Sequence, residues 1–187
     1  MRAKSPFRLA LLLLPALLLG PAAARAGTDG FAYAFTAIEG GPLPLADYRG
    51  KAVLVANTAS FCGFTPQYED LQAVYDRYRD RGLVVLGVPS DDFNQESDDD
   101  AAIKTFCEVN YKITFPLTER VHVEGPQSHP LFAHFREALG EKAGPGWNFY
   151  KYLIAPDGRV VASRPSSVKP TSAEITGAIE RALPGAS

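Results

Sequence analysis

The sequence contains very little sulfur. Its 187 residues include two cysteines, Cys62 and Cys107, and one methionine. There is no Cys-x-x-Cys pair, which excludes the dithiol turn of disulfide-exchange enzymes, because such a turn keeps a second sulfur within reach of the first. Two cysteines can form a single structural disulfide. The cysteine count alone leaves that interpretation open, so the positions of the two residues must decide.

The sequence also lacks an apolar run long enough to cross a membrane comfortably. The run Leu9–Gly20 has 12 residues and is interrupted by Pro15, whereas a spanning helix needs about 20. It follows a basic segment at residues 2–8 and precedes the small-x-small sequence Ala24-Arg25-Ala26. This pattern predicts a cleavable signal peptide at residues 1–26, no stable membrane insertion, and export to the periplasm or outside the cell. The alternative is an anchor that is not cleaved.

No surplus of basic charge is present. Residues 1–26 hold four of the 19 basic residues and none of the 21 acidic ones, which leaves 15 basic against 21 acidic residues in 27–187. A net charge near −6 argues against nucleic acid or anionic lipid as a partner, because both are polyanions. Residues 27–187 contain no repeat and no linker, and they predict a single domain.

What the chain does contain is an alternation of apolar strands and amphipathic helices. Apolar runs at 52–56 and 83–88 enclose a helix at about 66–80, which predicts a β–α–β unit with parallel strands buried on both faces. The remaining pattern predicts strands at 31–35 and 114–117, helices at 98–111, 130–139 and 172–183, and a β-hairpin over 149–163. The element order predicts the α/β class, with a central mixed β-sheet and helices on both faces.

Cys62 occupies the loop between the first buried strand and its helix. Thr65 and Pro66 have the residue types of an N-cap and a first helical position, which places the thiol just before a helix N-terminus. The positive end of the helix dipole and its unpaired N–H groups favour a thiolate there. This arrangement is that of thioredoxin-like folds. Gly63-Phe64-Thr65 follows Cys62 without a second cysteine, so the sulfur is predicted to attack something other than a disulfide.

A cysteine-based peroxidase needs hydrogen-bond donors around its thiolate and a way to reduce the sulfenic acid that forms. Side-chain amides and an indole N–H can donate without adding charge. The candidates are Gln95, in the loop after the second parallel strand, and the pair Trp147-Asn148, just before the hairpin. Taken singly they have ordinary interpretations, since a tryptophan often packs in a core and a loop glutamine is usually solvated.

Together these segments make the sequence resemble the glutathione peroxidase family. The matches run in order through nearly all of residues 27–187: Gly50-Lys51, 57–68, 82–89, Gln95-Glu96, Thr114-Phe115-Pro116, Gly125-Pro126, His129-Pro130 and Trp147-Asn148-Phe149. The resemblance implies a thioredoxin-like fold and a thiol peroxidase that reduces hydrogen peroxide, organic hydroperoxides or both. It also implies a catalytic tetrad of Cys62, Gln95, Trp147 and Asn148, with cysteine in the family's selenocysteine position.

Cys107 matches the resolving cysteine of the family branch that prefers thioredoxin to glutathione. In that role it would condense with the Cys62 sulfenic acid, and a thioredoxin-like dithiol or glutathione would be the reductant. The alternative is a cysteine that is simply buried on the apolar face of its helix. Because the two cysteines lie on different elements, the bridge would require local unwinding of the second helix. The short segment 140–146 lacks the insertion of the tetrameric members, which implies a monomer.

One segment departs from the family pattern. Asp91-Asp92-Phe93-Asn94 precedes Gln95 where the family usually has Asn-Gln-Phe-Gly-x, so the loop is one residue shorter and lacks the glycine. Asn94 can adopt the positive φ that glycine would supply. The three histidines show no metal-ligand spacing, and we expect no metal and no cofactor. A peroxide sensor that passes its disulfide to a partner protein would use the same cysteines and is the alternative function.

Overall fold

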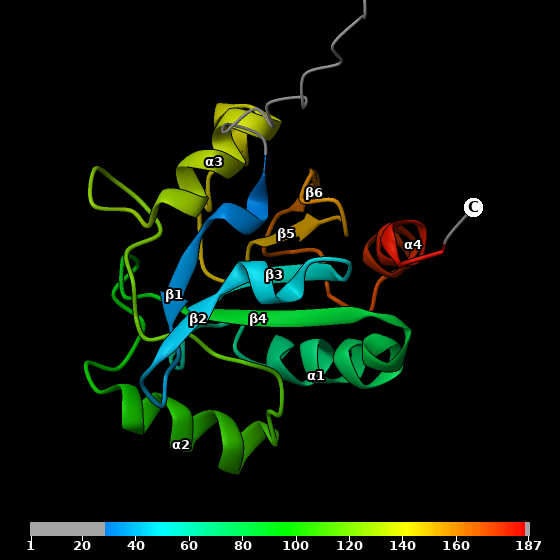
Figure 1. The fold of residues 1–187 in the computed structure, drawn as a ribbon. Coiled ribbons are helices and arrows are strands. Elements are labelled where there is room, and N and C mark those ends of the chain that lie inside the picture. The colour runs from blue at the N-terminus through cyan, green and yellow to red at the C-terminus, as the bar shows by residue number, and fades with distance from the viewer. Residues whose placement is uncertain (1–28, 186–187) are drawn as a thin grey trace, which may run out of the picture.

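The computed structural model describes residues 29–185, so the predicted signal peptide lies outside the described residues. The centre of the fold is a four-stranded sheet in the order β4-β3-β5-β6. β3 pairs in parallel with β4, whereas the β3–β5 and β5–β6 pairs are antiparallel (Figure 1). The strands are β3 (Ala52–Thr58), β4 (Leu83–Pro89), β5 (Lys151–Ile154) and β6 (Val160–Arg164). The sheet is therefore mixed, as the element order predicts.

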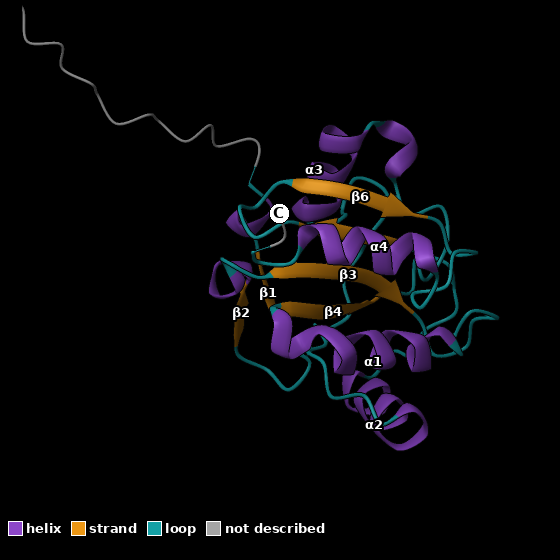
Figure 2. Cartoon of the chain, turned by 90° about the vertical axis from the view of Figure 1, so that its right-hand side faces the viewer, coloured by secondary structure: helices purple, strands orange, loops and turns teal. Residues whose placement is uncertain are grey.

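Helices cover both faces of the sheet, which is why every residue of β3 and β4 is buried. Alternate residues of β3 enter two separate apolar clusters, Leu54 in one and Val53 and Val55 in the other. Figure 2 shows α1 and α4 lying across the same face of the sheet. The first cluster receives side chains from α1 (Gln67–Tyr78), α2 (Asp100–Tyr111) and α4 (Ala173–Ala182), and the second from α3 (Pro130–Leu139).

Two expected strands differ in the structure. Residues 30–32 form a 3-10 turn, and the strand β1 (Ala34–Thr36) begins after it and pairs with β2 (Pro42–Pro44) in a separate two-stranded sheet. Segment 114–117 is not a strand, because its contact with β4 is a single bridge between Gly87 and Leu117. Pro116 has no N–H to extend a ladder. Within residues 29–185, no helix has both the length and the apolarity that crossing a membrane requires.

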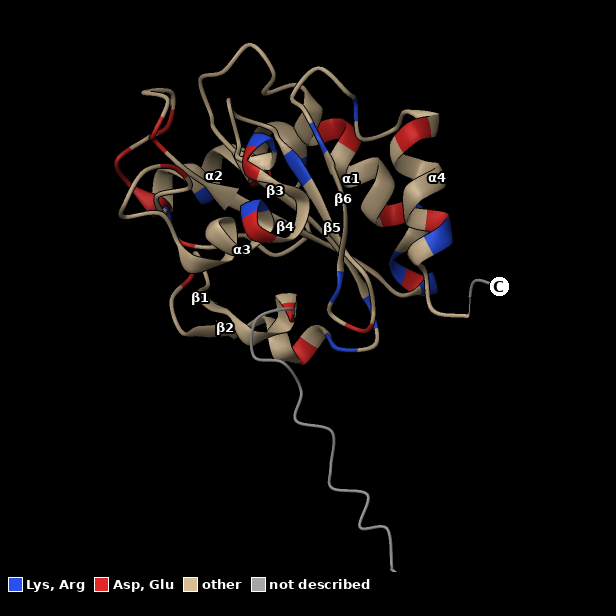
Figure 3. Ribbon diagram, turned by 90° about the horizontal axis from the view of Figure 1, so that it is seen from above, with Lys and Arg blue, Asp and Glu red and all other residues tan. Residues whose placement is uncertain are grey.

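Figure 3 shows acidic residues gathered in the loop beside α2. Their carboxylates bond to other parts of the chain. Asp99 caps α2 by accepting from the Ala101 N–H, at 2.9 Å, and Asp98 pairs with Arg120 at 2.7 Å. Asp92 accepts from the backbone N–H groups of residues 123 and 124 and contacts His122. Burial raises the pKa of Asp92, but the hydrogen bonds from His122 and the two N–H groups outweigh it and lower the pKa. The acids thus hold the loop and the helix start in place.

Lys151 is a basic side chain inside the fold, with only 1% of its surface exposed. Its Nζ donates to Gln67 Oε1 at 2.9 Å, to the Val168 carbonyl at 2.5 Å and to the Ser166 carbonyl at 3.4 Å. Burial lowers the pKa of Lys151 to about 7, although Asp70 raises it slightly. The residue ties β5 to the start of α1 and to the loop after β6.

We therefore expect the free energy of unfolding to rise as the pH is raised from about 7 to about 10. In this range the unfolded lysine still binds a proton that the folded one has lost, because an unperturbed lysine titrates near 10.4. The total rise from this group is roughly 5 kcal/mol. Urea unfolding across this pH range should show the rise in the wild type and in the exposed-lysine control Lys169→Met. Lys151→Met should lack it, and an equal slope in all three proteins would contradict the assignment.

Candidate active site

Cys62 lies in the turn between β3 and α1, with 7% of its surface exposed. Thr65 closes this turn, because its Oγ1 accepts from the Cys62 N–H at 3.0 Å and donates to the Ala59 carbonyl at 2.9 Å. The N–H of Phe64 donates to the Cys62 Sγ at 3.4 Å. The turn thus directs one backbone N–H at the sulfur.

The start of α1 differs from the sequence prediction. The helix begins at Gln67, and Thr65 bonds back to the Cys62 turn instead of acting as N-cap. The Gln67 and Tyr68 N–H groups donate to the carbonyls three residues before them, at 2.8 and 3.0 Å, which is a 3-10 type of turn. The donor to the sulfur is therefore a local turn N–H and not the open end of the α-helix.

The loop that carries Gln95 is joined directly to the Cys62 turn. The Phe61 N–H donates to the Gln95 carbonyl at 2.9 Å, and the Ser60 N–H donates to Glu96 Oε1 at 3.1 Å. Asn94 has a φ of +55°, so it supplies the left-handed conformation that the shorter loop needs in place of glycine. Glu96 is buried, and burial raises its pKa. The two loops form one unit although more than thirty residues separate them.

Asn148 and Trp147, in the segment before β5, both contact the loop that carries Gln95. Asn148 is fully buried, and its Nδ2 donates to Gln95 Oε1 at 3.1 Å. Trp147 is 41% exposed, and its ring centroid lies 5.2 Å from that of Phe93. The structure thus joins Gln95 and Asn148 directly and links both to the Cys62 turn through Phe61. Within residues 29–185, the Phe64 N–H is the one group that hydrogen-bonds the Cys62 sulfur.

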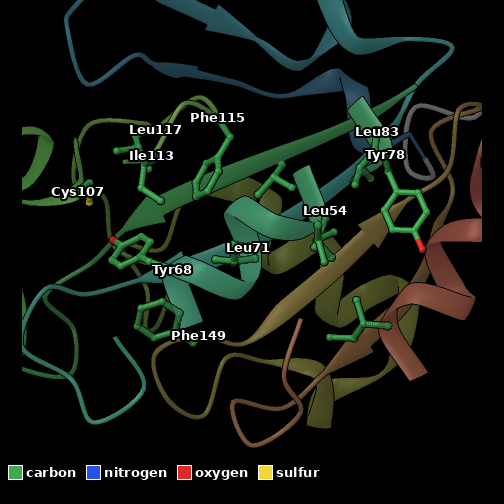
Figure 4. Close-up of a cluster of buried hydrophobic side chains, with 14 of the residues drawn as sticks. Leu54, Tyr68, Leu71, Tyr78, Leu83, Cys107, Ile113, Phe115, Leu117 and Phe149 are labelled. Atoms are coloured by element: carbon green, nitrogen blue, oxygen red, sulfur yellow. The ribbon is translucent and has the colours of Figure 1, made fainter. Parts of the chain in front are cut away.

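Cys107 is fully buried on α2, and neither cysteine is in a disulfide. Figure 4 shows the Tyr68 hydroxyl pointing toward it, although that hydroxyl makes no hydrogen bond of ordinary geometry with the described residues. Burial raises the pKa of the Cys107 thiol to about 11, while Tyr68 lowers it to a smaller extent. A thiol that stays protonated is a poor nucleophile. Cys107 is therefore chemically protected in this conformation.

Sequence reasoning missed the roles of three residues that hold the site. Thr65 fixes the Cys62 turn, Glu96 joins the two loops, and Asn57 bonds the segment that carries Trp147 and Asn148. Asn57 had one available signal, since it is a polar residue at the end of an otherwise apolar strand. The partners of Thr65 and Glu96 could not be found from the pattern alone.

Comparison with known proteins places this arrangement in a family. The family model described as "Glutathione peroxidase" matches residues 31–136. The chain belongs to the glutathione peroxidase family. The chain is therefore a thiol peroxidase that reduces hydroperoxides.

Individual relatives extend the match over most of the chain. It is 44% identical to the "Hydroperoxy fatty acid reductase gpx1" of Synechocystis, over 86% of this chain and 99% of that protein. It is 41% identical to the "Glutathione peroxidase-like peroxiredoxin GPX5" of Chlamydomonas reinhardtii, over 79% and 93% of the two chains. The crystal structure of Trgpx in its apo form superposes with a TM-score of 0.68 at 32% identity, covering 84% of this chain and 96% of that one. The predicted thioredoxin-like fold is confirmed.

Proposed function

We propose that this protein works by a two-cysteine cycle in which Cys62 is oxidised and Cys107 resolves it. The Cys62 thiolate attacks the outer oxygen of a hydroperoxide, the O–O bond breaks, and the leaving alkoxide or hydroxide takes up a proton. Cys62 is left as a sulfenic acid. The observation that carries this assignment is the Phe64 N–H on the Cys62 sulfur. The same turn is bonded through the Phe61 N–H to Gln95, which in turn bonds Asn148.

The second step requires Cys107 to leave its buried position. Its sulfur then bonds to the Cys62 sulfur, the S–O bond of the sulfenic acid breaks, and the hydroxide departs as water with the Cys107 proton. α2 has to open locally for the two sulfurs to meet, because Cys107 is fully buried in the reduced protein. An external dithiol then reduces the disulfide and restores both thiols.

Gln95, Trp147 and Asn148 supply the polar surroundings of the reacting oxygens in this proposal. The Asn148 side chain uses its Nδ2 on Gln95, and its Oδ1 is buried without a hydrogen-bond partner among residues 29–185. An unpaired buried acceptor is costly, and a hydroperoxide O–H or a water would satisfy it. The Trp147 indole N–H can donate to the departing oxygen without adding charge.

We propose organic hydroperoxides with apolar tails as substrates alongside hydrogen peroxide. Phe61, next to Cys62 in sequence, is 67% exposed, and Trp147 is 41% exposed. Exposed aromatic side chains on the Cys62 turn and on the Trp147 segment favour an apolar substituent on the peroxide. The name of the Synechocystis relative, a reductase of hydroperoxy fatty acids, points to the same chemical class.

The proposed reductant is a thioredoxin-like dithiol protein, with glutathione as the competing possibility. The Chlamydomonas relative is named as a peroxiredoxin, and Cys107 is available to form an intramolecular disulfide. We also propose that the protein is exported after cleavage following Ala26 and that it acts as a monomer. The alternative, a sensor that passes its disulfide to a client protein, is favoured only if a mixed disulfide with one client accumulates.

The proposed function is tested by an assay of residues 27–187 with two peroxides and two reductants. Turnover of hydrogen peroxide and a fatty acid hydroperoxide is measured with thioredoxin plus its reductase, or with glutathione. We expect faster turnover with thioredoxin, for both peroxides. Turnover with glutathione and none with thioredoxin would contradict the proposed dithiol reductant. Amino-terminal sequencing of protein from the exported fraction should begin at Gly27.

A further inference from the structure

The Trp147–Tyr150 segment is held in a conformation that its own backbone disfavours. Phe149 has a φ of +61°, in the left-handed region, and is fully buried. A positive φ is a genuine outlier for a bulky aromatic residue and persists only where surrounding contacts enforce it. Other residues must therefore hold this segment in place.

Asn57 makes four hydrogen bonds to that segment. Its Nδ2 donates to the Trp147 carbonyl at 3.1 Å, and its Oδ1 accepts from the Tyr150 N–H at 2.9 Å. Its backbone carbonyl accepts from the Phe149 N–H at 2.6 Å, and its N–H donates to the Tyr150 carbonyl at 3.3 Å. Asn57 is itself fully buried. One residue thus brackets Asn148 on both sides, at positions 90 and 93 residues further along the chain.

Asn57 also lies on the strand from which the Cys62 turn departs. It is the second-to-last residue of β3 and lies five residues before Cys62. Ala59, two residues after it, accepts the Thr65 hydroxyl that closes the Cys62 turn. The end of β3 therefore holds both the segment that carries Trp147 and Asn148 and the turn that carries Cys62.

We propose that Asn57 is a positioning residue that sets where Trp147 and Asn148 stand relative to the Cys62 sulfur. This proposal rests on the proposed function, because it assigns Asn57 to the peroxide step. An amide is needed at position 57 because it offers a donor to one carbonyl and an acceptor to one N–H at the same time. A carboxylate would place a second acceptor against the Trp147 carbonyl, and a hydroxyl is too short to reach both groups.

The test compares Asn57→Asp and Asn57→Ser with a matched control, Thr118→Val. Thr118 is also fully buried, and its hydroxyl donates to the Glu119 carbonyl at 2.7 Å. The valine variant loses this hydrogen bond, but Thr118 has no part in the site. Two rates are measured on each reduced, folded protein: oxidation of Cys62 by peroxide and alkylation of Cys62 by iodoacetamide. Alkylation needs the thiol but not the groups that receive the peroxide oxygens.

We expect peroxide oxidation to slow by about 10- to 100-fold in both Asn57 variants, since a misplacement of about 1 Å can cost that much. Alkylation should stay within about twofold of the wild type, and Thr118→Val should change neither rate. In Asn57→Asp, the peroxide rate relative to wild type at the same pH should recover as the pH is lowered. The protonated carboxyl then again carries one donor and one acceptor.

A parallel loss of both rates would overturn the proposal, because Asn57 would then act on the Cys62 turn itself. So would a peroxide rate no lower than that of Thr118→Val. Acrylamide quenching of Trp147, the single tryptophan, needs no turnover: we expect stronger quenching in the Asn57 variants, and unchanged quenching overturns the proposal. A wild-type protein that does not react with peroxide would refute the proposed function. A reactive wild type with unaffected Asn57 variants would refute only the role of Asn57.

Discussion

Cys62→Ser is expected to reduce peroxide consumption to the background rate of buffer. A serine hydroxyl is a far weaker nucleophile than a thiolate at neutral pH and forms no sulfenic acid. The fold should survive, because serine is nearly the same size and can still accept from the Phe64 N–H. Residual hydroperoxide is measured after mixing with excess protein, and circular dichroism confirms folding.

The matched control for this experiment is Cys107→Ser, which keeps Cys62. It should consume peroxide in the first turnover at the wild-type rate, because Cys107 is buried and protonated in the reduced protein. Peroxide consumption retained by folded Cys62→Ser would show that another group is the nucleophile, and the proposed cycle would be wrong.

Cys107→Ser itself should stop turnover with the dithiol reductant after one equivalent of peroxide per chain. The Cys62 sulfenic acid would form but would have no internal thiol to condense with. The measurements are the stoichiometry of peroxide consumed and the mass of the sulfenic acid adduct with a trapping reagent. Thioredoxin-driven turnover that continues at the wild-type rate would contradict the resolving role.

Val109→Ser is the control for that variant. Val109 is on the same helix, two residues from Cys107, and is 71% exposed. It places the same serine on α2 without removing the thiol, so turnover should be unchanged. If both variants lose turnover, the loss comes from the helix and not from the sulfur.

Much of the fold could be predicted because its strongest signals are local. The runs at 52–56 and 83–88 are continuously apolar, and they form the buried parallel pair β3 and β4. The segment 114–117 also has strand-forming residues, but Pro116 and a single bridge to Gly87 limit its pairing. The start of α1 could not be placed because Thr65 bonds to the Cys62 turn, and residue type does not distinguish that bond from an N-cap.

Candidates for the site could be named from the sequence where the chemistry requires unusual residue types. Cys62, Gln95 and the Trp147-Asn148 pair stand out as a thiol, amides and a single indole, and the structure bonds Gln95 to Asn148. Asn57 was not predictable in the same way, because its partners lie about ninety residues away. A side chain that satisfies distant backbone groups leaves no periodic pattern in the sequence.

The full burial of Cys107 has a consequence for how the protein fails under heavy oxidation. In the proposed cycle the Cys62 sulfenic acid waits for α2 to open, and during that interval a second peroxide can convert it to the sulfinic acid, which a dithiol does not reverse. The opening equilibrium of one helix therefore competes with the peroxide concentration. Substitutions that stabilise α2 should make the enzyme more easily inactivated by excess substrate, and those that loosen it should make it more tolerant.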